Sequence, residues 1–144
     1  MKTWVKIILG LFVVGIITIV LVYVFVYNKS HPDFEKMKPD YTLSASELYN
    51  SFKSNTTRSE SKYNGKVISV NGTLTKVEST DSLVIAVFAF TQGMFGDEGI
   101  RCTMLPSYNV EAKNLLPGSV CSIKGFCAGF NDPDVILEQC SIIK

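Results

Sequence analysis

Histidine is almost missing from this sequence, and with it most of the motifs on which hydrolases and metalloenzymes are built. His31 is the only one, so no Ser–His–Asp or Cys–His arrangement can be assembled in a folded domain, and neither an HExxH segment nor a P-loop occurs. The four cysteines have no C-x-x-C spacing, which argues against a zinc site. We therefore predict that the chain is not an enzyme and binds no metal or cofactor.

An excess of positive charge is also lacking. From residue 28 onward, 12 Lys and Arg residues stand against 13 Asp and Glu residues, a net charge of −1. A surface that binds nucleic acid normally shows a basic excess, because release of counterions from the phosphates supplies most of the non-specific affinity. The composition therefore disfavours nucleic acid as the partner.

One long apolar run is present near the N-terminus. Ile7–Tyr27 contains 21 residues without a charge, and about 20 apolar residues suffice to span a bilayer core of about 30 Å. A signal peptide has a shorter apolar stretch that is followed by small residues at a cleavage site, whereas this run ends in the bulky segment Val22–Tyr27. We predict a short stub over residues 1–6 and an uncleaved, single-pass transmembrane helix over residues 7–27.

The orientation of this helix rests on its layout. Lys2 and Lys6 precede the run, while Lys29, Lys36 and Lys38 follow it, so the flanking positive charges are nearly balanced. A short N-terminal stub before a long C-terminal tail is typical of a signal anchor. We expect an integral membrane protein whose C-terminal domain lies outside the cytoplasm.

The region after the apolar run divides into a linker and one domain. Residues 28–43 mix charges with two prolines and predict a linker. Ser44–Glu47 has the pattern of a capping box, and Leu48 and Phe52 continue an apolar stripe at helical spacing. A domain over residues 44–144 with a leading helix over residues 44–62 is therefore expected.

Five segments rich in β-branched and apolar residues follow this helix and predict five strands. They are Lys66–Val77, Leu83–Phe90, Ile100–Leu105, Ser119–Phe126 and Val135–Ile143. Gly72 lies inside the first, and a glycine there suggests a bulge or a bend of the kind that small barrels need. The longest connection lies between the third and fourth strands. The pattern predicts a mainly β fold, a five-stranded OB-fold Greek-key barrel.

Several short motifs support this fold, and they occur in a fixed order between about Ser44 and Ile142. They are Glu47-Leu48 with Phe52, Lys62–Lys66, Val70–Gly72, Cys102, Leu116–Gly118, Lys124–Cys127 and Asp134–Cys140. In this order the sequence resembles the bacterial OB-fold proteins of the tRNA-anticodon-domain-like family, as a membrane-anchored member. The resemblance implies an N-terminal signal or anchor, here an anchor in the bacterial inner membrane, and it implies nucleic-acid binding by analogy of fold only.

Both faces of the second predicted strand are apolar. We assign the alternating set Leu83, Ile85, Val87 and Ala89 to the barrel interior. The other set, Val84, Ala86, Phe88 and Phe90, then needs a cover. That cover is the leading helix, the loop around Met94-Phe95, or a protein partner, since contiguous apolar surface often marks an interaction site.

The ligand face of an OB-fold includes its second and third strands. Phe88, Phe90, Phe95 and Arg101 are therefore the candidate residues for binding a ligand or partner. Aromatic rings beside an arginine also suit the stacking of bases, although the charge balance disfavours it.

The cysteines allow a disulfide in an exported domain. Cys127 and Cys140 flank the turn at Asp132-Pro133 almost symmetrically, so neighbouring antiparallel strands would bring them close. Cys102 competes for Cys140, because the last strand of an OB-fold lies between the third and the fourth. Alternatively, all four cysteines serve as small core residues.

Three functions remain open. The first is a membrane-tethered, non-catalytic binding or adaptor module of the bacterial cell envelope, with a protein or a small polar molecule as its ligand. The second is an OB domain that binds single-stranded nucleic acid or oligosaccharide. The third is a haem or redox carrier, because the haem chaperone of cytochrome c maturation is also an anchored OB-fold. That family uses a histidine near the end of its barrel, and residues 136–144 contain none.

Overall fold

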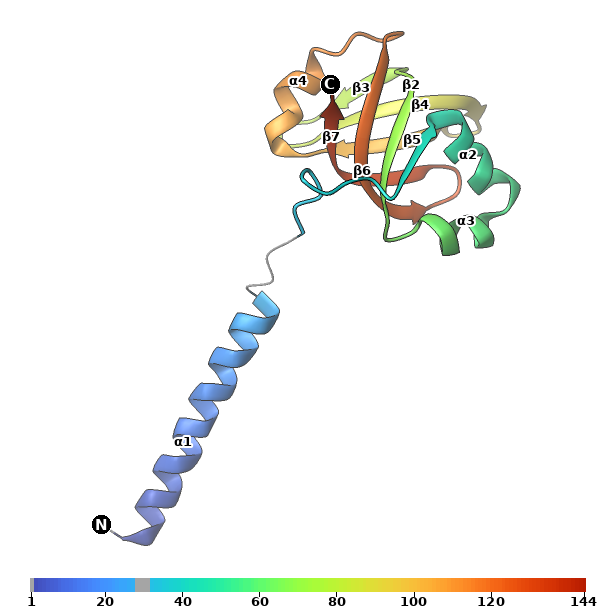
Figure 1. Ribbon diagram of the computed structural model, residues 1–144. Helices are drawn as coiled ribbons and strands as arrows, with labels where there is room; N and C mark the ends of the chain where they lie inside the picture. Colours follow the sequence, from blue (N-terminus) through green and yellow to red (C-terminus); the bar gives the residue numbers. More distant parts are fainter. Residues whose placement is uncertain (1, 28–31) are drawn as a thin grey trace. The chain divides into compact units, whose positions relative to one another are not determined.

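The computed structural model describes residues 2–27 and 32–144, and the chain divides into two units, Met1–Pro32 and Asp33–Lys144. In the first unit, helix α1 (Thr3–Val22) continues into a π-helical turn, η1 (Tyr23–Tyr27). Together they form 25 helical residues that are long and apolar enough to cross a membrane (Figure 1). At 1.5 Å per residue this helix is about 37 Å long. Membrane anchors and signal sequences share these properties.

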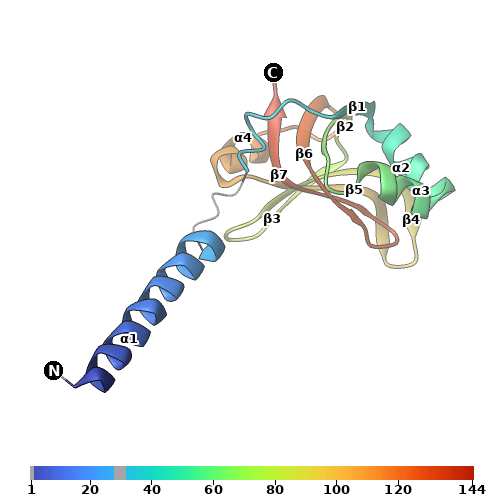
Figure 2. The same ribbon diagram turned by 60° about the horizontal axis from the view of Figure 1, so that its bottom comes forward.

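The second unit is mainly β, and Figures 1 and 2 show its strands curving around a common interior. Its strands are β1 (Tyr41–Ser44), β2 (Val67–Thr73), β3 (Lys76–Ser79), β4 (Val84–Gly93), β5 (Gly96–Met104), β6 (Val120–Phe130) and β7 (Val135–Ile143). Its helices are α2 (Ala45–Ser54), α3 (Thr56–Tyr63), the short 3₁₀ turn η2 (Pro106–Tyr108) and α4 (Asn109–Lys113). Helices α2 and α3 lie side by side, at the opposite end of the domain from α4 (Figure 1).

The strands form one seven-stranded sheet in the order β1-β2-β6-β7-β5-β4-β3. Strands β2 and β3 follow each other in sequence, yet β2 pairs with β6 and β3 pairs with β4. The chain turns between them at Leu74, whose N–H and C=O bond to Ser119 and Gly118 of the β6 side. The next residue, Thr75, donates its N–H to Val87 O of β4 at 2.9 Å. One bent segment thus reaches both ends of the sheet, which is the arrangement of the first strand in an OB-fold.

The predicted fold class is confirmed, but the strand count differs from five. The predicted first strand, Lys66–Val77, is split into β2 and β3 by the bend at Leu74. The other additional strand is β1, which overlaps the end of the predicted linker. It pairs in parallel with β2, with Tyr41 opposite Ile68. Asp40 adds two hydrogen bonds to Val67 at the start of this pairing. These backbone bonds depend on a partner about 27 residues away, which periodicity within the linker cannot reveal.

Residues just before β1 also pack on the barrel. The ring of Phe34 stacks on Phe126 of β6 at 4.8 Å between centroids. The ammonium group of Lys124 donates to the backbone oxygens of Glu35 and Met37 at 2.7 and 2.8 Å. The segment from Asp33 onward is therefore part of the domain.

Two helices stand where one leading helix was predicted. Ser44 accepts a hydrogen bond from Glu47 N at 3.1 Å, so the predicted N-terminal cap of α2 is confirmed. Asn55 leaves the helical conformation, and its side chain caps α3 by accepting from Arg58 N at 3.0 Å. Because Asn55 caps the second helix, the break between the helices costs little free energy. The chain forms an elbow between α2 and α3 at this residue.

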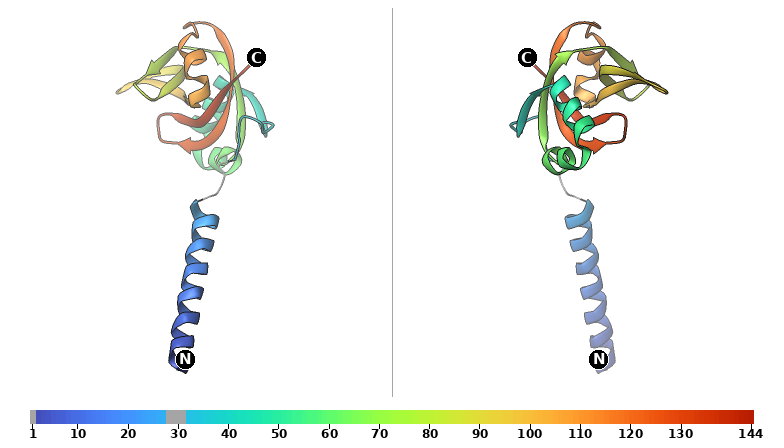
Figure 3. Two further views of the ribbon diagram at one scale, coloured as in Figure 1. Left: turned by 90° about the vertical axis from the view of Figure 1, so that its left-hand side faces the viewer. Right: turned by 90° about the vertical axis from the view of Figure 1, so that its right-hand side faces the viewer.

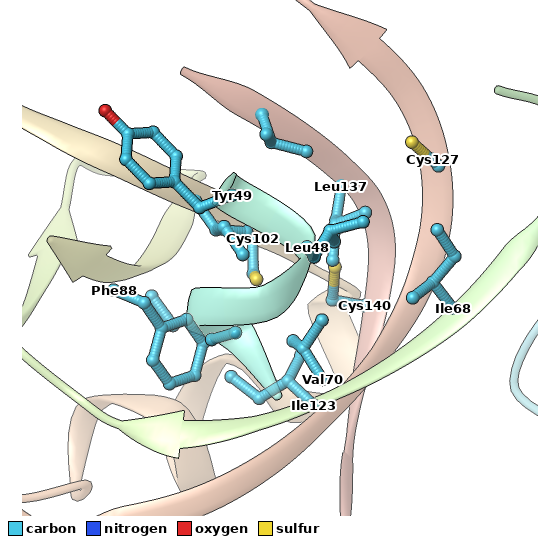
Figure 4. Packing of buried hydrophobic residues seen from close by; sticks show 14 of the residues in the cluster. Leu48, Tyr49, Ile68, Val70, Phe88, Cys102, Ile123, Cys127, Leu137 and Cys140 are labelled. Carbon is cyan, nitrogen blue, oxygen red and sulfur yellow. The ribbon is translucent and has the colours of Figure 1, made fainter. Parts of the chain in front are cut away.

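The core lies between the concave side of the sheet and α2 (Figure 4). Leu48 and Phe52 are fully buried there, as their spacing predicted. Gly72 is required at this contact because a Cβ on it would lie 2.9 Å from the Cβ of Ala45 and 3.4 Å from the ring of Phe88. The glycine lets the first turn of α2 approach the sheet closely.

Candidate functional site on the β4–β5 hairpin

Strand β4 faces the core with the alternation opposite to the predicted one. Val84, Ala86 and Phe88 belong to the buried core cluster. Phe88 has no exposed surface and packs beside Gly72 under the first turn of α2 (Figure 4). The physical reason is the cover that α2 supplies, since both faces of β4 are apolar and only the packed helix distinguishes them. Phe88 is therefore a core residue and is not available to bind a ligand, in contrast to the prediction.

Phe90 lies two residues further along the same strand, at the edge of the core, and is partly exposed to solvent. Its side chain is 40% exposed, and one face of its ring stacks on Tyr49 of α2 at 5.3 Å. The Tyr49 hydroxyl is within 3.0 Å of Thr91 Oγ1, and Thr91 Oγ1 donates to Glu98 Oε2 at 3.2 Å. These contacts join the hairpin to α2, so Phe90 is held in one position with its other face available.

The hairpin is longer than the sequence indicated. The predicted strands ended at Phe90 and resumed at Ile100 with a loop around Met94-Phe95 between them, but β4 and β5 remain paired as far as Gly93 opposite Gly96. Only Met94 and Phe95 form the turn, and their side chains are 91% and 98% exposed. The yellow hairpin projects from the rest of the sheet in Figure 3. Two large apolar side chains are thus presented at the end of an ordered ribbon.

Arg101 on β5 lies near the base of this hairpin and forms ion pairs with two carboxylates. Its Nε donates to Asp134 Oδ2 at 2.8 Å, and its Nη1 donates to Glu78 Oε2 at 2.9 Å. Asp134 is only 7% exposed, and its other oxygen accepts the N–H of Gly99 at 2.8 Å. The hydrogen bond and the charge of Asp134 raise the pKa of Arg101, and Glu78 adds to this effect. This guanidinium is a structural clamp between β3, β5 and β7.

Further ion pairs extend the network along the outer face of the hairpin. Lys76 contacts Glu78 at 3.0 Å and Asp97 at 3.2 Å. The hydrogen bond from Lys76, followed by the charge of Arg101, lowers the pKa of the Glu78 carboxyl. Lys53 of α2 contacts Glu98 at 3.4 Å. Three cations thus face four carboxylates around the hairpin, a net charge of −1 that does not attract a phosphate chain.

A small cavity lies at the foot of the tip. Its volume is about 130 Å³, and Phe95, Arg101 and Pro133 are among the residues that line it. Ligand pockets for small molecules usually measure about 300–1,000 Å³, so this cavity suits a single inserted side chain rather than a bound metabolite.

All four cysteines are free thiols, and the structure does not bring Cys127 and Cys140 together. Cys127 lies opposite Leu137, because bulges shift the register of β6 against β7. Cys140 instead lies on the side of Cys102 of the neighbouring strand β5 (Figure 4). Burial raises the pKa of Cys127 to about 11 and that of Cys140 well above its ordinary value. These thiols stay protonated at neutral pH and are core residues.

Metal ligands are not clustered in the part of the chain that the structure describes. Within residues 2–27 and 32–144, no group of three or more His, Cys, Asp or Glu side chains is arranged to hold a metal ion. His31 lies outside the described residues.

Some features of the hairpin escaped the sequence analysis. Met94 was expected only as a cover for β4, although Gly93 and Gly96, which flank Met94-Phe95, are a signal for a tight turn. The stacking of Tyr49 on Phe90 joins residues 41 positions apart and leaves no local pattern. Of the predicted residues, Phe95 and Arg101 line one small cavity, Phe90 packs on Tyr49 of α2, and Phe88 is buried.

Comparison with known proteins agrees with this architecture. A family model described as tRNA_anti-like matches residues 1–142. The chain belongs to this family. The resemblance predicted from its motifs is thereby confirmed for nearly the whole length. No curated protein matches the chain.

Solved structures are similar to this tRNA_anti-like domain. One is a lipoprotein of Klebsiella pneumoniae that has been proposed to bind nucleic acid, with a TM-score of 0.58 and 20% identity, covering 81% of this chain and 100% of that chain. At this identity the likeness to the lipoprotein concerns the fold alone. Another is the aspartyl tRNA synthetase of Entamoeba histolytica, with a TM-score of 0.45 and 13% identity, covering 81% of this chain and 23% of that one.

Proposed function

We propose that this chain is a non-catalytic binding module of the bacterial cell envelope, tethered to the membrane by α1 and docking on a protein partner through the tip of the β4–β5 hairpin. The observation that carries the proposal is the exposure of Met94 and Phe95, at 91% and 98%. Methionine and aromatic side chains are enriched at protein interfaces. The tether is supported by the length and composition of Thr3–Tyr27, and an envelope location suits the lipoprotein of similar fold.

The hairpin supports docking because it is held before any partner arrives. Tyr49 stacks on Phe90, and Lys76 bridges to Asp97. A binding element that is already ordered loses less conformational entropy on association than a mobile loop does. The small cavity beside Phe95 offers a place for one partner side chain. An apolar tip with an ion-paired rim is the usual anatomy of a protein interface.

Nucleic acid is the competing ligand, since the Klebsiella lipoprotein was proposed to bind it. The charges around the hairpin argue against it here, because Arg101 and Lys76 are already paired with carboxylates. Stacking of one base contributes about 1–3 kcal/mol, which does not offset the loss of translational freedom on binding. Sub-micromolar, salt-sensitive binding of a single-stranded oligonucleotide to the full-length protein would overturn the proposal.

Site-specific photo-crosslinking in living cells tests the docking directly. A photoreactive residue at Phe95 is compared with one at Val110 of α4, an apolar residue that is 75% exposed. We expect a discrete protein adduct from position 95, absent at position 110, that disappears when Met94→Asp is added. Identical adducts at both positions, or adducts only with nucleic acid or lipid, would contradict the proposed function.

A further inference from the structure

A second cavity lies at the elbow between α2 and α3, and the residues that line it are far in sequence from the hairpin tip. Its volume is about 290 Å³. The residues that line it are Ser51, Ser54, Asn55, Arg58, Ser59, Lys62 and Tyr63. This lining contains hydroxyls, one amide and two cations, and no carboxylate. Such a composition is suited to an anion.

Two positive charges in the elbow lack a counter-charge. Among residues 2–27 and 32–144, neither Arg58 nor Lys62 forms an ion pair. They are four positions apart on α3, so they lie on the same face of the helix, and like charges at this spacing are destabilising. A bound anion would remove this repulsion.

Other donors in the cavity complete the arrangement. Asn55 uses its Oδ1 to accept from Arg58 N, which leaves its amide NH₂ to donate elsewhere. The hydroxyl of Ser54 is exposed and forms no hydrogen bond to another described residue. A guanidinium fork, an ammonium group, an amide and a hydroxyl together match the several oxygens of a phosphate better than the two of a carboxylate.

The elbow is also held in shape. Ser59 of α3 donates to the backbone oxygen of Ser51 in α2 at 2.7 Å, which fixes one helix against the other. The Lys62 ammonium lies 4.9 Å from the centre of the Tyr63 ring and 5.4 Å from that of Tyr41. These cation–π contacts orient Lys62 without neutralising its charge.

We infer that the α2–α3 elbow is a binding site for a phosphate group, with Arg58 and Lys62 as its principal ligands. The chain carries a helix that is long and apolar enough to cross a membrane, so a phospholipid headgroup is one source of the phosphate, and a free phosphate or phosphate monoester is the other. Both offer the same chemistry to the cavity.

The test uses the isotope-labelled full-length protein and follows the amide signals of residues 51–63 by NMR. In the first arm the protein is in alkyl maltoside micelles, which contain no phosphate, and inorganic phosphate is titrated at constant ionic strength. In the second arm it is in nanodiscs of phosphatidylcholine with increasing phosphatidylglycerol. Shifts confined to the elbow in the first arm identify free phosphate as a ligand, and shifts in the second arm alone identify a lipid headgroup.

Matched variants decide whether the elbow is responsible. We expect Arg58→Gln with Lys62→Gln to weaken binding at least about tenfold, whereas Lys113→Gln with Lys144→Gln, which removes the same charge elsewhere, leaves it unchanged. Ser54→Asp keeps both cations but adds a carboxylate, and it should also abolish binding. The absence of elbow shifts in both arms, or equal weakening by the two double variants, would overturn the inference.

Discussion

Arg101 and Arg58 are the two arginines of this chain, and the structure surrounds them in opposite ways. Arg101 donates to Asp134 and Glu78 at 2.8 and 2.9 Å and links strands from three parts of the sequence. Arg58 lines an open cavity and, within the described residues, makes no ion pair. The sequence analysis selected Arg101 as a ligand-binding candidate because it lies on the usual OB-fold face, and it did not consider Arg58.

The difference shows that a cation's place in a fold does not by itself indicate binding. Arg101 lies on the face that other OB-folds use for ligands, yet its charge is already balanced by Asp134 and Glu78. A phosphate that approached this guanidinium would also meet the two carboxylates, which repel it. An unpaired cation in a cavity keeps its full attraction for an anion. The predictions below test this contrast, from the largest effect to the smallest.

The largest effect is expected from Arg101→Gln. Removing this side chain leaves the Asp134 carboxylate, in a residue that is 7% exposed, without its ionic partner. Breaking a fully buried ion pair costs about 3–5 kcal/mol, and Arg101 is partly exposed, so we expect a loss of about 2–3 kcal/mol in the free energy of unfolding. Urea unfolding of the full-length protein in detergent measures it.

Arg101→Lys is the control for charge. It keeps the positive charge but cannot donate to two carboxylates from one planar group. We expect an intermediate loss of stability. If the glutamine variant is as stable as the wild type, Arg101 is not a clamp and becomes available as a ligand-binding residue.

A smaller effect on stability should come from the protonation of the Glu78 carboxyl as the pH falls. Lys76 and Arg101 lower the pKa of this carboxyl in the folded state below its ordinary value of 4.5. The unfolded state therefore binds the proton more readily, so the stabilisation is complete above about pH 4.5 and is lost as the pH falls through the lower, folded value. The difference in stability between wild type and Glu78→Gln should shrink between pH 6 and pH 3. A difference that is constant over this range would show that the ion pairs do not stabilise the fold.

The smallest effect is expected from Arg58→Gln. Its side chain is exposed and forms no ion pair with the residues that the structure describes, so the free energy of unfolding should change by no more than about 0.5 kcal/mol, the usual range for surface positions. Loss of repulsion from Lys62 should make the sign slightly stabilising. A destabilisation like that of Arg101→Gln would mean that Arg58 is also a structural residue, and it would remove the contrast between the two arginines.

Much of the architecture follows from local patterns. The capping box at Ser44 sets the start of α2, and Val135–Ile143 was predicted with the bounds that the structure shows. Cys127 and Cys140 could not be judged in this way, because their distance depends on bulges in β6 and β7. The paired state of Arg101 was equally hidden, since Glu78 lies on β3 and Asp134 in the loop before β7.

The sequence by itself determined the long apolar helix, the mainly β fold and its family, because each is written in runs, alternation and turn motifs along the chain. It could not decide which face of β4 lies inside. Both faces of Val84–Phe90 are apolar, and a period of two residues is the same for either choice. Only the tertiary structure decided it, when Ala45 of α2 packed against Gly72 and buried Phe88, leaving Phe90 at the edge. Contact between distant segments, which has no local signature, therefore separates the core residues of this domain from those that a partner can reach.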